Sequence, residues 1–180
     1  GDGTHDNKFE PIQVGKGTVW SKVSAGKDYV VALADNGILW SWGRNNYGQL
    51  GNGTTDYVVP SQVTELKEWK DVSCGSISTI AIKLNGTLWA WGNNDYGQLG
   101  NGKTNNKYSP VQISSKPWVY ISAGEYYNFA INNNNELYAW GNSSKCLGIE
   151  TTEPRITSPT KVGSMYWDKV IAGKIGRAHV

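Results

Sequence analysis

The sequence has little of the material from which catalytic and metal sites are built. Its 180 residues include only two histidines, two cysteines and one methionine. The histidines, His5 and His179, lie near opposite ends of the chain, and no Cys/His cluster has the spacing of a metal site. No Ser/His/Asp set can be assembled around them. We therefore expect no enzyme, no catalytic residue, no metal site and no cofactor.

An excess of one charge and long apolar runs are also missing. The 17 Lys and Arg and the 15 Asp and Glu residues leave a net charge of +2. A nucleic-acid-binding domain more often concentrates basic residues on one face, so we expect no nucleic-acid partner. No stretch of about 18 uncharged apolar residues is present, so we expect no membrane insertion. The compartment is left open, with an extracellular or cell-surface location favoured.

What the sequence has instead is a repeat of 49 residues. Trp20-Ser-Lys-Val-Ser-Ala-Gly26 returns in similar form from Trp69, Trp118 and Trp167, each 49 residues further on. The dipeptide Trp-Gly recurs with the same spacing at 42, 91 and 140. Tyr-Gly-Gln-Leu-Gly at 47–51 recurs at 96–100 and shortens to Lys-Cys-Leu-Gly at 145–148. Such a period is the signature of a repeat architecture, in which neighbouring units bury each other's apolar faces.

Each unit has the pattern of short β-strands. An apolar run at 31–33 is followed by Asn36-Gly37 and by a second apolar run at 38–42, and the next unit repeats this around Asn85-Gly86. Asn-Gly between two apolar runs is a strong signal for a β-hairpin. Two more short runs, around 22–25 and 60–63, complete the unit. The sequence therefore predicts an all-β fold of propeller blades, each a four-stranded antiparallel sheet, arranged as a partial ring.

The phase of the repeat divides the chain. We expect the second half of a preceding repeat at 1–19, repeats at 20–68, 69–117 and 118–166, the start of a further repeat at 167–174, and a non-native tail at 175–180. The tail, Ile-Gly-Arg-Ala-His-Val, resembles the translation of a common sequencing adaptor, and it places His179 where Ala32 stands in the first full repeat. A divergent final repeat is the alternative. Since the chain opens within a repeat, we expect it to be a fragment of a longer protein.

All nine tryptophans fall in three positions of the repeat. They are Trp20, Trp69, Trp118 and Trp167; Trp42, Trp91 and Trp140; and Trp40 and Trp89. Exposed aromatic ladders can bind sugars or stack on bases. A strictly periodic tryptophan more often packs in a core, so we expect these side chains between the blades. The recurring glycines are expected at tight turns.

These motifs resemble the regulator of chromosome condensation repeat, as in Val-Ser-Cys-Gly at 72–75, Asn-Gly-Thr-Leu-Trp-Ala-Trp-Gly at 85–92 and Tyr-Gly-Gln-Leu-Gly at 96–100. The resemblance implies a seven-bladed propeller, of which this chain is about half. One departure is the His-Thr or His-Ser that the family often places between Ala-Gly and the next apolar strand, where this chain reads Lys27-Asp-Tyr29, Ser76-Ile-Ser-Thr79 and Glu125-Tyr-Tyr-Asn128. The short, Asn-rich units look closer to bacterial members that grip a protein with loops than to the eukaryotic nucleotide-exchange factor.

We therefore predict a protein-interaction scaffold whose partner, another protein, is bound by loops on one face. The candidate contacts follow Ala-Gly and Trp-Gly, at the expected blade ends, and tyrosines suit this role because they bury much area at low entropic cost. They are Lys27, Asp28, Tyr29, Arg44, Asp95, Glu125, Tyr126 and Tyr127. The alternative is a cell-surface carbohydrate- or cell-wall-binding module. An enzyme would need catalytic groups from further blades or a fused domain.

Overall fold

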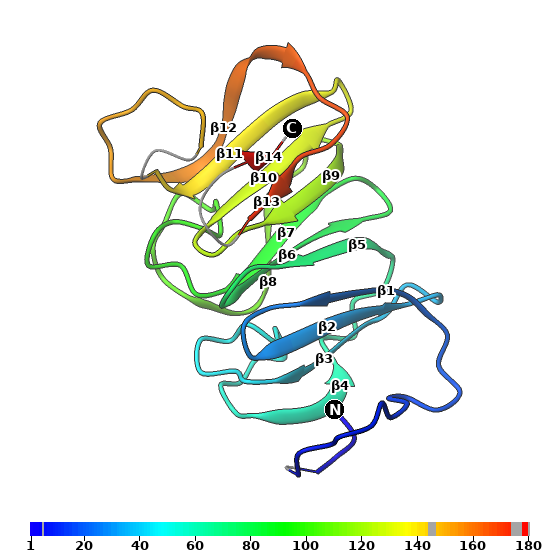
Figure 1. Ribbon diagram of the computed structural model, residues 1–180. Coiled ribbons are helices and arrows are strands. Elements are labelled where there is room, and N and C mark those ends of the chain that lie inside the picture. The colour runs from blue at the N-terminus through cyan, green and yellow to red at the C-terminus, as the bar shows by residue number, and fades with distance from the viewer. Residues whose placement is uncertain (5, 144–146, 174–177, 180) are drawn as a thin grey trace.

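The repeat folds into three successive four-stranded antiparallel sheets, each with its strands in chain order (Figure 1). A computed structural model describes the chain except for residues 5, 144–146, 174–177 and 180. The blades are β1 (Trp20–Ala25), β2 (Tyr29–Ala34), β3 (Leu39–Gly43) and β4 (Val58–Gln62); β5 (Trp69–Cys74), β6 (Ser78–Lys83), β7 (Leu88–Gly92) and β8 (Lys107–Ser114); and β9 (Trp118–Ala123), β10 (Tyr127–Asn132), β11 (Glu136–Asn142) and β12 (Arg155–Tyr166). The predicted all-β blade fold is confirmed.

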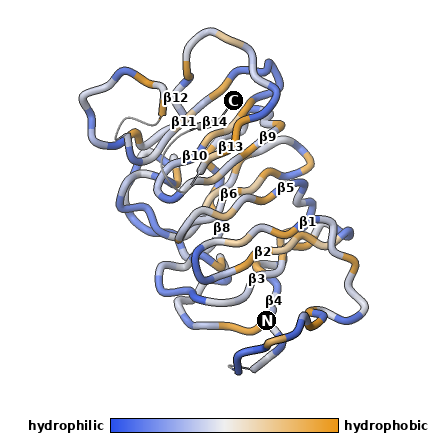
Figure 2. Tube along the Cα trace, viewed as in Figure 1, coloured by the Kyte–Doolittle hydropathy of each residue, from blue (hydrophilic) through white to orange (hydrophobic). Residues whose placement is uncertain are grey.

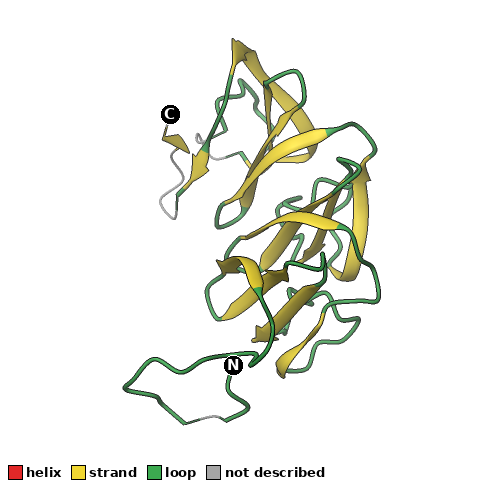
Figure 3. Ribbon diagram, turned by 90° about the vertical axis from the view of Figure 1, so that its right-hand side faces the viewer, coloured by secondary structure: helices red, strands yellow, loops and turns green. Residues whose placement is uncertain are grey.

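The blades stack on one another through their faces, and the two chain ends lie at opposite ends of the stack (Figures 1 and 3). Strand β5 contacts β1 and β2 of the blade before it, and β9 contacts β5 and β6. Apolar residues concentrate along the strands while the loops are mostly hydrophilic (Figure 2). One apolar cluster joins the first blade to the second and includes Val31, Leu39, Val72 and Trp91. A second cluster joins the second blade to the third and includes Ile80 and Trp140.

The predicted hairpins form between the second and third strands of each blade. Their turns hold Gly37, Gly86 and Asn135 at φ values of 76°, 81° and 60°, in the left-handed region that glycine and asparagine tolerate best. The carbonyls of Gly37 and Gly86 accept hydrogen bonds from the backbone N–H of Trp69 and Trp118, at 3.1 and 2.9 Å. Each hairpin turn therefore also fixes the start of the next blade.

Two of the three tryptophans of the Trp-Gly motif are core residues, as predicted, whereas Trp42 of the first blade is only partly buried. Trp91 and Trp140 are fully buried, and their indole N–H groups donate to the carbonyls of Gln49 and Gln98, both at 2.9 Å. Each acceptor belongs to the preceding blade. A Cβ atom on Gly51 would lie 2.7 Å from the Trp91 nitrogen, so the close approach requires glycine at that position.

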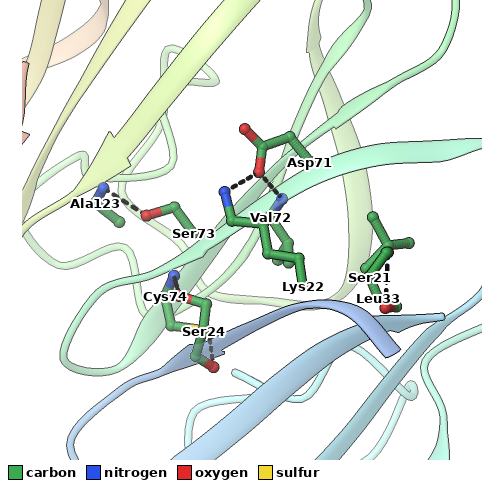
Figure 4. A network of polar contacts seen from close by, with 9 residues as sticks. All are labelled: Ser21, Lys22, Ser24, Leu33, Asp71, Val72, Ser73, Cys74 and Ala123. Carbon is green, nitrogen blue, oxygen red and sulfur yellow. Dashed lines mark hydrogen bonds and ion pairs between the residues drawn. The ribbon is translucent and has the colours of Figure 1, made fainter. Parts of the chain in front are cut away.

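The first strands of the blades lie side by side and are joined by serine hydroxyls. Ser24 Oγ accepts from the Cys74 N–H at 2.9 Å, and Ser73 Oγ accepts from the Ala123 N–H at 3.0 Å (Figure 4). Ser122 Oγ bonds the Ala172 N–H in the same way, at 2.9 Å. An ion pair between Lys22 and Asp71 adds a further link between β1 and β5. Side chains thus satisfy backbone groups that no neighbouring strand pairs.

One apolar position of the repeat, occupied by Val23 in the first blade, shows how each blade buries residues of the next. Val72, Ile121 and Val170 occupy equivalent positions and are 0%, 3% and 0% exposed. Val23, the equivalent residue of the first blade, is 64% exposed. Burial at this position therefore depends on a preceding blade face and not on the strand itself.

The last strands depart from the repeat. In the complete blades the register of the first two strands pairs Ser24 with Val31, Ser73 with Ile80 and Ser122 with Phe129. The 49-residue period would therefore pair Ile171 with residue 178. In the pair of β13 (Ile171–Ala172) and β14 (Ala178–His179), Ile171 faces His179 instead, a shift of one residue. The proposed non-native tail at 175–180 lies largely outside the described residues and stays a prediction.

Replacing Val72 by alanine should lower the free energy of unfolding by about 2 kcal/mol, because two buried carbon groups are lost and a cavity forms. The same change at Val23 is the matched control and should shift stability by no more than about 0.5 kcal/mol. Equilibrium urea unfolding measures both. Equal losses would contradict burial of this position by the preceding blade.

Replacing Ser73 by alanine should cost about 1–3 kcal/mol, because the Ala123 N–H between the blades loses its acceptor. The control is Ser21→Ala, an exposed residue whose hydroxyl donates to the Leu33 carbonyl within one sheet at 3.0 Å. That variant should change stability by about 0.5 kcal/mol or less. A Ser73→Ala protein as stable as the Ser21→Ala protein in the same unfolding assay would show that the hydroxyl does not couple the blades.

Candidate interaction face

One edge of the blades gathers the loops that carry most of the predicted contacts. Antiparallel strands alternate in direction, so the ends of the first and third strands of a blade lie at the same edge. The Arg44 N–H donates to the Asp28 carbonyl at 2.8 Å, and the Asn93 N–H donates to the Ile77 carbonyl at 3.0 Å. We call this edge the loop face: the turns at 26–28, 75–77 and 124–126, and the segments that follow β3 and β7.

Buried amide side chains build the loop that follows the third strand. Asn45 Oδ1 accepts from the Leu50 N–H at 3.0 Å, and its Nδ2 donates to the Thr54 carbonyl at 2.9 Å. Asn94 repeats both bonds in the second blade, to Leu99 and Lys103. Fully satisfied buried amides fix a single conformation, so this loop is rigid.

The tyrosine that opens the Tyr-Gly-Gln-Leu-Gly motif projects from this frame. Gln49 Oε1 accepts from the Tyr47 N–H at 3.0 Å, while the Tyr47 side chain remains 36% exposed. Tyr96 makes the same backbone contact to Gln98, at 2.9 Å, and is 40% exposed. Neither tyrosine is among the contact residues predicted from the sequence.

Tyr96 meets Tyr126 of the next blade across the loop face. The ring centroids are 4.9 Å apart and the planes are inclined by 46°. Partial burial and the neighbouring Glu125 carboxylate raise the pKa of Tyr126, with smaller contributions from Tyr96 and Tyr47. We call Tyr47, Tyr96 and Tyr126 the tyrosine cluster.

Two of the predicted contact residues, Tyr29 and Tyr127, lie in the core, so their assignment as loop contacts is wrong. Each is the first residue of a strand and is 3% or 4% exposed. The Tyr29 hydroxyl donates to the Ser78 carbonyl at 2.6 Å, and burial raises its pKa well above the usual value. The Tyr127 hydroxyl donates to the Gly173 carbonyl at 2.7 Å. Both tyrosines bond the next blade, and partner contact falls to other residues.

The structure brings the other predicted residues together at the loop face. Lys27, Asp28, Arg44 and Asp95 are exposed, and Glu125 is half-buried. Arg44 Nη1 lies 3.4 Å from Asp28 Oδ2, an exposed ion pair. We call the first strands of the blades, β1, β5 and β9, the inner strands. An open cavity of about 360 Å³ lies between their ends at the loop face, and Lys27 and Glu125 both line it.

The described residues offer little reactive chemistry. They contain no group of three or more His, Cys, Asp and Glu side chains placed to hold a metal ion. Burial raises the pKa of the Cys74 thiol to about 11, and its Sγ donates to the Ser24 carbonyl at 3.3 Å. At neutral pH this cysteine is a buried thiol and a poor nucleophile. No helix long and apolar enough to cross a membrane is found in the described parts of the chain.

Solved structures share this fold. Yeast Prp20 bound to Kap60 superposes with a TM-score of 0.78 at 20% identity, covering 91% of this chain and 42% of that one. Human WBSCR16 gives a TM-score of 0.76 at 21% identity, covering 86% of this chain and 42% of that one.

Curated relatives match over shorter stretches. The X-linked retinitis pigmentosa GTPase regulator homolog of Caenorhabditis elegans is 38% identical over 53 residues, which are 28% of this chain and 4% of that protein. Human E3 ubiquitin-protein ligase HERC2 is 40% identical over 60 residues, 33% of this chain and 1% of that protein. The chain thus spans only a small part of these relatives.

Family models give the assignment. A model described as the regulator of chromosome condensation (RCC1) repeat matches residues 36–82 and 85–131, and a second model of that description matches 20–49, 69–98 and 118–145. These ranges contain the Trp-Gly and Tyr-Gly-Gln-Leu-Gly motifs and the hairpins whose geometry repeats from blade to blade. The chain belongs to the regulator of chromosome condensation repeat family.

Proposed function

We propose that this chain is part of a non-enzymatic protein-interaction scaffold and that another protein binds its loop face. The observation that carries the proposal is the tyrosine cluster, which presents partly exposed rings at the junctions between blades. Tyrosine is enriched at binding hot spots because it combines a large contact area with few rotatable bonds.

The frame behind the cluster supports this function. Tyr47 and Tyr96 extend from loops held by the buried Asn45 and Asn94, so binding would not require these loops to become ordered. A preorganised surface loses less entropy on association than a flexible one. Exposed charges, including the Arg44–Asp28 pair and Asp95, lie on the same loop face as the rings. Apolar anchors within a polar rim are the usual composition of a protein interface.

Protein binding by a protein of the same fold supports a protein as the class of partner. Yeast Prp20 has been solved bound to Kap60 and studied for its binding to Gsp1p and histones. The shared fold does not carry those partners to this chain. We propose the class of partner only, with the contacts assigned to Lys27, Asp28, Arg44, Asp95, Glu125 and the tyrosine cluster.

A photo-cross-linking amino acid at position 96 should give discrete protein adducts in an extract of the source organism, read out by mass spectrometry. The same group at Leu84 is the control, since this residue is 67% exposed and follows β6 at the opposite blade edge. Adducts at 84 equal to those at 96, or none at either, would contradict the proposal. Retention on cell-wall polysaccharide without protein adducts would favour the carbohydrate-binding alternative.

Tyr96→Ala combined with Tyr126→Ala should weaken binding of the cross-linked partner by about 30-fold or more, the loss expected for hot-spot side chains. Leu84→Ala should leave affinity unchanged. Surface plasmon resonance with the purified partner provides the measurement, and an unchanged affinity of the double variant would remove the tyrosine cluster from the interface.

A further inference from the structure

The two junctions between complete blades share a frame but differ in the residues that they present. At the first junction Tyr47 is accompanied by Ser76 and Ile77 of the next blade. At the second, 49 residues later, Tyr96 is accompanied by Glu125 and Tyr126. The second junction therefore adds a carboxylate and a second aromatic ring to the same backbone.

Two of the three side chains of the second junction are in contact, and the third directly precedes one of them in the same turn. The ring centroids of Tyr96 and Tyr126 are 4.9 Å apart, and Glu125 lies next to Tyr126 in the turn at 124–126. Burial and the Glu125 carboxylate both raise the pKa of Tyr126. Glu125 is half-buried at the cavity between the inner strands, and no ion pair joins it to another described residue. Lys27 of the first blade lines the same cavity, but the ion pairs of the described residues do not include one between Lys27 and Glu125.

We infer that the second junction binds a basic side chain of the partner protein, an arginine, which stacks on Tyr96 and Tyr126 and places its charge at Glu125. This inference rests on the proposed function and specifies what the loop face recognises. Aromatic faces attract cations, and a guanidinium group can stack on a ring while its N–H groups bond a carboxylate. Partial burial of the carboxylate strengthens the pairing, because fewer waters compete for it.

Selection of random 12-residue peptides displayed on phage against the immobilised protein tests the inference. Among the enriched peptides, we expect those whose binding requires Tyr96 to share an arginine. Replacing that arginine by citrulline, which keeps the shape and removes the charge, should weaken binding by about tenfold. Glu125→Gln should produce the same loss, with the conserved fold checked by circular dichroism.

The outcomes separate the two proposals. Peptides whose binding requires Tyr96 but that contain no shared basic residue, or that tolerate Glu125→Gln, overturn the arginine site and leave the loop face as an interface. Enriched peptides that all tolerate Tyr96→Ala overturn the loop-face interface itself and the arginine site with it.

The first junction offers a test by gain of function. Ser76→Glu with Ile77→Tyr reproduces the second junction on the frame of Tyr47, at two positions that are only half-buried. The doubly substituted protein should bind two copies of a selected arginine peptide in isothermal titration calorimetry, where the unmodified protein binds one. A single site in both proteins would show that the three side chains are not sufficient to bind the arginine.

Discussion

The arrangement of the blades depends on one contact, in which a serine hydroxyl accepts a hydrogen bond from a backbone N–H of the next blade. The inner strands β1, β5 and β9 belong to different sheets and form no hydrogen-bonded ladder with one another, so their facing backbone groups need side-chain partners. Ser24, Ser73 and Ser122 supply these partners at an offset of 50 residues. Because the turns of the loop face follow directly after these strands, the same bonds set the spacing between Lys27, Ser76 and Glu125.

A second set of contacts fixes neighbouring blades relative to each other away from the inner strands. The indole groups of Trp91 and Trp140 bond carbonyls of the preceding blade, and the hairpin carbonyls of Gly37 and Gly86 bond the start of the following one. The frame is thus fixed at both edges of each blade, whereas the residues after Ala-Gly are free to vary. Recognition can therefore differ between junctions without any change of backbone, as the contrast between Ser76-Ile77 and Glu125-Tyr126 illustrates.

The period and the local pattern were enough to predict the strands, the Asn-Gly hairpins and the tryptophan core, since all of these depend on contacts that recur every 49 residues. Exposure at the blade ends was harder to predict. Tyr126 and Tyr127 are neighbours in sequence, yet only Tyr127 is buried, because it begins β10 and packs in an apolar cluster that includes Val170. Tyr47 and Tyr96 were missed because a constant motif can hold its glycines and glutamine in the frame while its aromatic ring faces solvent.

Native-state hydrogen exchange at the Cys74 and Ala123 amides tests the coupling between blades most directly. If the serine hydroxyls join the blades into one cooperative unit, both amides should exchange in low urea through a single opening with the same free energy and urea dependence. The Ala172 amide, bonded by Ser122, should approach the same limit. Rapid exchange at Ala123 while Cys74 stays protected would show that the blades open independently and that the loop face is not held by these bonds.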